Sequence, residues 1–65
     1  MDFLIGNLVF ISIPTKRHGL TGVQGIVTAV GEVSDKPDAF WLQIAGMSTT
    51  FYSDEMIVEK VANNG

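Results

Sequence analysis

Hydrophobic residues along this chain fall into short runs that are rich in β-branched and aromatic side chains, and polar stretches containing glycine or proline separate the runs. Such runs are typical of β-strands, because branched and aromatic side chains pack well on a pleated surface. The pattern predicts strands at residues 8–13, 23–30, 40–44, 49–52 and 57–61. The sequence therefore predicts an all-β protein with five strands. The strand at 23–30 is continuous enough in apolar character to predict burial on both faces.

The segments between these runs carry turn-forming residues. Pro14 is expected to end the first strand, since proline has no ladder donor, and to open a polar loop over residues 14–22. Residues 34–38 predict a second loop, and residues 45–47 a tight hairpin. Residues 53–56 read as a single helical turn that Ser53 caps, with the following acids at its positive end. Residues 62–65 are expected to form a flexible tail.

The hairpin between the third and fourth strands determines which side chains face the core. If its register is even, the core face carries Phe40, Leu42, Ile44, Thr49 and Phe51, because the side-chain period of a strand is two. The outward face then carries Trp41, Gln43, Thr50 and Tyr52. An odd register would instead place Trp41 beside Phe51, and the sequence favours the even one.

Three segments of the chain carry a family resemblance. The run Gly22-Val23-Gln24-Gly25-Ile26-Val27 resembles the core of a KOW motif, in which a glycine pair brackets the start of a strand. Residues 6–11 resemble the opening strand of that family, and residues 52–57 the close of many small barrels. The resemblance implies one five-stranded SH3-like barrel over residues 1–61, with a short 3-10 turn before the last strand. By themselves, Gly22 and Gly25 are expected to relieve crowding and to accept a positive φ or a bulge.

Length and composition narrow the class of protein. Sixty-five residues form one domain, and 46% of them are apolar, which is a large share to bury in so small a core. Self-association into a homo-oligomer, or a stable protein partner, is therefore expected. The chain has no cysteine and one histidine, so no metal site and no cofactor is expected. No apolar run approaches the roughly 18 residues of a membrane span, and no export signal is recognisable, so the cytoplasm is expected.

Two groups of side chains are candidates for partner binding. Trp41, with Gln43, Thr50 and Tyr52, would form an aromatic strand face of the kind that anchors protein interfaces. The alternative for Trp41 is a cap on the end of a barrel too small to bury it fully. Lys16, Arg17 and His18 form the second group, a basic loop cluster that could assist this face or meet phosphate, although it also reads as an ordinary solvated loop tip.

These candidates predict a non-enzymatic interaction module, an accessory or regulatory subunit that binds a protein. The alternative is a KOW-like module associated with RNA or the ribosome, which the net charge of −3 makes less expected. Asp54 and Glu55 suit a helical turn better than acid–base chemistry, because no nucleophile and base accompany them. Plasmid-type dihydrofolate reductases are also small barrels, yet only Tyr52 matches their pore strand, so no enzyme activity is expected.

Overall fold

The computed structural model describes residues 3–17 and 19–61, and it is all-β, as the sequence predicts. Five strands and one 3-10 turn follow one another along the chain. They are β1 (Leu8–Arg17), β2 (Leu20–Val33), β3 (Lys36–Ile44), β4 (Thr50–Tyr52), η1 (Ser53–Glu55) and β5 (Ile57–Lys60). Nowhere in these residues is there a helix of the length and apolar character needed to cross a membrane.

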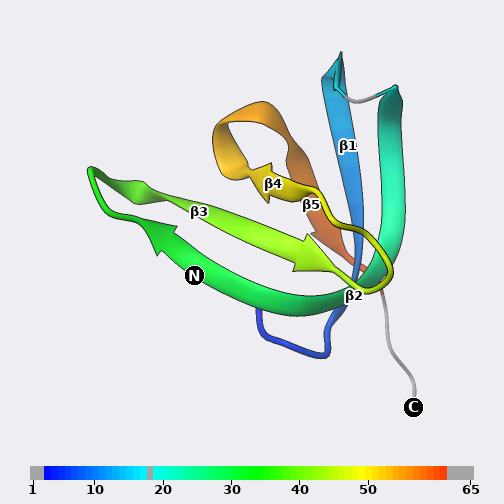
Figure 1. Ribbon diagram of the computed structural model, residues 1–65, viewed down its shortest axis with the longest axis horizontal. Helices are drawn as coiled ribbons and strands as arrows, with labels where there is room; N and C mark the ends of the chain where they lie inside the picture. The colour runs from blue at the N-terminus through cyan, green and yellow to red at the C-terminus, as the bar shows by residue number, and fades with distance from the viewer. Residues whose placement is uncertain (1–2, 18, 62–65) are drawn as a thin grey trace.

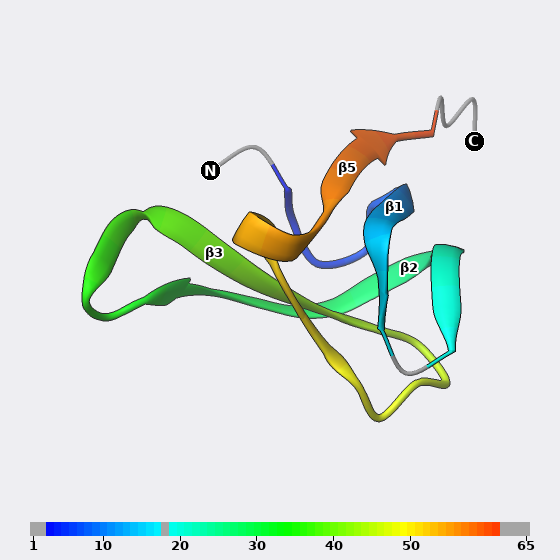
Figure 2. The same cartoon turned by 90° about the horizontal axis from the view of Figure 1, so that it is seen from above.

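All neighbouring strands are antiparallel and form one sheet in the order β4-β3-β2-β1-β5. The long strand β2 curves strongly, so that its first half pairs with β1 and its second half with β3 (Figure 1). Seen from above, the β2–β3 hairpin reaches away from the group formed by β1, β5 and the start of β2 (Figure 2). β4 and β5 are the two edges of the sheet, and η1 links them without a ladder between them.

The core lies on one face of this bent sheet. Alternate residues of β1 are buried there, because side chains of a strand point to opposite faces in turn. The other strands add residues from the same face. The buried side chains are Val9, Ile11, Ile13, Val27, Leu42, Ile44 and Phe51. The predicted burial of the second strand on both faces is wrong, since only Val27 of β2 is buried.

The first two predicted loops are mostly strand. β1 continues through Pro14 to Arg17, and β2 begins at Leu20. Pro14 is tolerated because the β1–β2 register is irregular between Ser12 and Arg17, so no ladder pair requires its missing N–H. The second predicted loop contracts to a turn at residues 34–35, after which β3 starts at Lys36. Short turns between long strands therefore replace the loops expected from proline and polar residues.

Ser53 has a different role from the predicted cap. The residue that precedes η1 in extended conformation is Tyr52, and no side chain caps the turn. The Ser53 hydroxyl instead accepts a hydrogen bond of 3.0 Å from the backbone N–H of Phe40. This bond ties the start of η1 to β3, so it continues the connection that β4 makes with β3.

The two glycines of the predicted motif allow close approach between strands. Gly22 and Gly25 lie in β2 and neither has a positive φ, while the irregular part of the β1–β2 register begins beside Gly22. A Cβ atom on Gly25 would lie 2.5 Å from Cγ2 of the buried Ile44. A Cβ atom on Gly22 would lie 3.2 Å from the ring tip of Phe10, an exposed residue that has room to move.

Gly25→Ala is therefore expected to destabilise the protein by about 1–3 kcal/mol, because the new methyl group overpacks the core against Ile44. The matched change Gly22→Ala should be neutral or stabilising by up to about 1 kcal/mol, since it only restricts the unfolded chain. Urea unfolding followed by circular dichroism measures both. Equal effects of the two substitutions would contradict this assignment of the two glycines.

Candidate partner-binding face

The outward side of β2, β3 and β4 carries the aromatic residues singled out in the sequence. The buried Leu42 lies opposite the buried Phe51, which is the even register, so the alternate residues point away from the core. Two cross-strand rows result, Gly31–Trp41–Tyr52 and Ala29–Gln43–Thr50. The predicted outward placement of Trp41, Gln43, Thr50 and Tyr52 is confirmed. We call these four residues the aromatic face.

Trp41 is half-buried by its own sheet, not by the core. Its indole covers Gly31, the residue opposite it on β2. A Cβ atom on Gly31 would lie 2.6 Å from Cε2 and 2.8 Å from Nε1 of the indole. A side chain at position 31 would therefore push the ring outward. Of the two sequence alternatives, the outward one describes the position of Trp41, and the glycine explains why so much of the ring is nevertheless covered.

The polar groups of the aromatic face differ in whether they have partners. The Gln43 side-chain amide donates a hydrogen bond of 3.1 Å to the Thr50 hydroxyl, and the Thr28 hydroxyl donates one of 3.3 Å to the Gln43 carbonyl. Within the described part of the chain, the indole N–H of Trp41 and the hydroxyl of Tyr52 have no hydrogen-bond partner. Tyr52 is 44% exposed. Both aromatic residues thus present an apolar ring with a free polar group.

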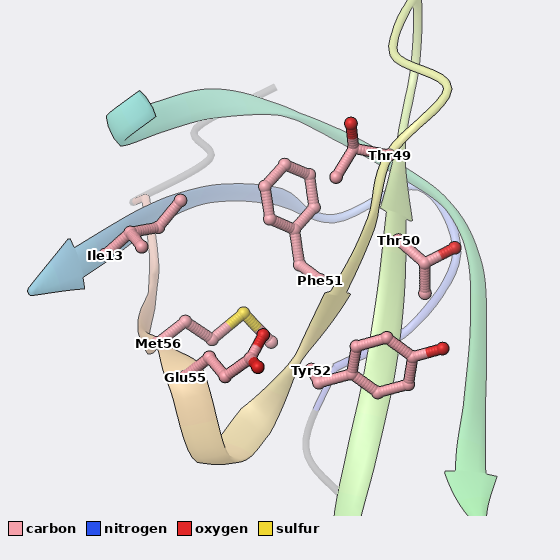
Figure 3. A pocket seen from close by; sticks show the side chains of 7 residues that line it. All are labelled: Ile13, Thr49, Thr50, Phe51, Tyr52, Glu55 and Met56. Carbon is pink, nitrogen blue, oxygen red and sulfur yellow. The ribbon is translucent and has the colours of Figure 1, made fainter. Parts of the chain in front are cut away.

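The aromatic face ends at an edge of the sheet. β4 has β3 as its one neighbour, and no loop or turn of the described chain bonds to its other side. Behind this edge lies a small hollow, to which Ile13, Phe51 and Met56 contribute apolar side chains (Figure 3). The other residues that line it are Thr49, Thr50, Tyr52 and Glu55. In the same view, Phe51 points toward Ile13 and Met56, whereas Thr50 and Tyr52 point to the other side of β4. Phe51 and the outward pair Thr50 and Tyr52 therefore lie on opposite sides of this edge strand.

Acidic residues surround one end of the aromatic face. A second hollow, between the β2–β3 turn and η1, has Tyr52 in its wall together with Asp35, Asp54 and Glu55. Asp38 lies in a neighbouring depression that shares Asp35 and Asp54. Lys36 lies in the same region, and its ammonium is 3.4 Å from the Asp54 carboxylate. This exposed ion pair contributes little to stability, and Asp35 and Asp38 add further negative charge there.

The basic cluster lies mostly outside the described residues. The backbones of Lys16 and Arg17 belong to the end of β1, so they extend a strand instead of forming the predicted loop. The side chains of Lys16 and Arg17, and the whole of His18, lie outside the described residues, as does the predicted tail at 62–65. The prediction that the cluster helps the aromatic face stays untested.

A second outward apolar group was missed in the sequence. Phe10, Ile26 and Ile57 are 41%, 41% and 58% exposed, and they lie on the outer side of β1, β2 and β5. The signal was present in β1, where Phe10 alternates with the buried Val9 and Ile11.

In residues 3–17 and 19–61, no three histidine or acidic side chains come together in a way that could hold a metal ion. Comparison with known proteins finds no match, whether to a protein-family model, to a curated protein or to a solved structure.

Gly31→Ala tests the packing of Trp41. The added methyl group should displace the indole toward solvent, with a stability loss of about 1–3 kcal/mol from overpacking. Trp41 is the single tryptophan of the chain, so its fluorescence emission should shift to longer wavelength and acrylamide should quench it more strongly. Gly22→Ala is the matched control and should leave the emission unchanged. Unaltered quenching in Gly31→Ala would contradict the contact.

Proposed function

We propose that this protein is a non-enzymatic interaction module with an SH3-like, incompletely closed barrel, and that it binds a protein partner through the aromatic face. The observation that carries the proposal is the cross-strand pair Trp41–Tyr52, which points outward beside a free sheet edge. The strand order and the 3-10 turn between β4 and β5 support the SH3-like fold. An accessory or regulatory subunit of a cytoplasmic assembly is the role that suits so small a module.

The chemistry of the two aromatic residues favours a protein as the ligand. Tryptophan and tyrosine bury large amphipathic rings on binding and are enriched among the residues that dominate interface energetics. Here each ring also offers a donor without a partner in the described chain, so a partner can gain directional bonds as well as apolar contact. The residues paired with this face on β2 are Gly31 and Ala29, which have no side chain or a small one, so the rings stand above the β2 surface. A partner can therefore approach the rings from that side.

Replacement of the two aromatic residues should separate binding from folding. Tyr52→Ala and Trp41→Ala are each expected to weaken partner binding by about 30-fold or more, as for residues worth about 2 kcal/mol at an interface. Phe10→Ala is the matched control, because Phe10 is a similarly exposed strand aromatic on the other outward face. All three variants should remain folded by circular dichroism.

A photo-crosslinking amino acid placed at Gln43, in the middle of the aromatic face, captures the partner. The crosslinked protein is then identified by mass spectrometry from nuclease-treated cell extract. Binding to that purified protein then gives the affinities of the variants. Equal binding by Tyr52→Ala and the parent chain would refute the proposal. Loss of the crosslink on nuclease treatment would favour the RNA-associated alternative. Unfolding of Trp41→Ala would show that Trp41 stabilises the fold instead of binding the partner.

A further inference from the structure

We infer that the segment this face takes is an extended, positively charged peptide strand that adds to the free edge of β4. This inference rests on the proposed function and names the kind of partner. Three features of the molecule support it: the unpaired edge of β4, the different side-chain environments on the two sides of β4, and the acidic residues near the end of β4.

The edge of β4 is short, and it carries no charged residue. Natural sheet edges are usually blunted by charged residues, especially lysine, which discourage pairing with another strand. β5, the opposite edge, carries Glu59 and Lys60. β4 consists of Thr50, Phe51 and Tyr52, all residues that favour strands and none of them charged. Of the two edges, β4 is therefore the one suited to accept an additional strand.

A strand added to β4 would meet two different surfaces. Its side chains would alternate, so every second one would lie beside Thr50 and Tyr52 on the aromatic face. The side chains between them would lie over the hollow lined by Ile13, Phe51 and Met56 (Figure 3). Main-chain hydrogen bonds to β4 would give affinity, and a small apolar side chain in the hollow would give specificity.

The acidic residues near β4 determine which side chains the added strand is expected to carry. The carboxylates of Asp35 and Asp54 share a hollow with Tyr52, Asp38 lies beside them, and Lys36 pairs with Asp54. A negative region beside a binding face speeds the approach of cationic ligands and repels anionic ones. Lysine or arginine side chains on the outward side could also lie over the rings of Trp41 and Tyr52. The expected ligand is therefore a segment in which basic and small apolar residues alternate, and nucleic acid is disfavoured.

The probe is a short capped peptide in which lysine alternates with valine, added to the full-length 15N-labelled protein. Amide resonances of Thr50, Phe51 and Tyr52 should shift and their hydrogen exchange should slow. The analogue with glutamate in place of lysine should bind at least about ten-fold more weakly. Two further analogues carry N-methyl groups on alternate residues, so that each blocks one edge of the peptide. One should bind and the other should not, because a single edge faces β4.

The protein variant Asp35→Asn/Asp54→Asn should weaken peptide binding and flatten its dependence on salt. Glu59→Gln, which removes an exposed acid from the other edge, is the matched control and should have no effect. Equal binding of both N-methylated peptides, or an unchanged salt dependence in the double variant, would overturn the inference. So would concentration-dependent shifts of β4 without peptide, which would identify a second copy as the occupant, or the same shifts with a single-stranded oligonucleotide.

The two proposals fail in different ways. If the lysine–valine peptide does not bind while Tyr52→Ala still loses its crosslinked partner, the aromatic face is the site and strand addition is wrong. If Tyr52→Ala keeps its partner, the aromatic face itself is wrong, whatever the peptide does.

Discussion

The curvature of β2 is the constraint on which the rest of the structure depends. One strand pairs with β1 through its first half and with β3 through its second, so the two halves of the sheet face each other across a single buried layer (Figure 1). Gly25 permits this by letting Ile44 approach the β2 backbone more closely than any side chain would allow. The layer is thin: seven buried apolar side chains form it, and further apolar side chains such as Val23, Phe40 and Val58 pack against it while partly exposed.

The outward residues are consequently numerous and partly apolar. On each half of the sheet an aromatic ring covers a glycine of β2: Phe10 over Gly22 and Trp41 over Gly31. This arrangement hides part of each ring without a second layer. The two halves differ at their edges, however. Trp41 adjoins Tyr52 on an uncharged edge strand, whereas Phe10 lies opposite Glu59 of β5. That difference directs the proposed function to the β3–β4 side.

The distribution of acidic residues also distinguishes the β3–β4 side of the sheet. The acids that make the chain negative include a group at the β2–β3 turn and η1, next to Tyr52. Asp54 and Glu55 were expected from the sequence only to suit the dipole of a short turn, and three residues of 3-10 helix offer little dipole to stabilise. Their position beside the aromatic face gives them a second physical consequence, which is the attraction of cations toward an open strand edge.

The sequence by itself determined the local features of this protein. Runs of β-branched and aromatic residues predicted the strands, and the serine and acids at 53–55 predicted the short helical turn. The outward side of Trp41 and Tyr52 followed from the fixed side-chain period of a strand, which is two. Only the tertiary structure decided where proline and glycine act. Pro14 lies within a strand since the ladder is irregular there, and Gly31 matters because an indole from another strand rests on it. Pairing between strands distant in sequence controls both effects, as it controls which edge stays open, and no local pattern encodes it.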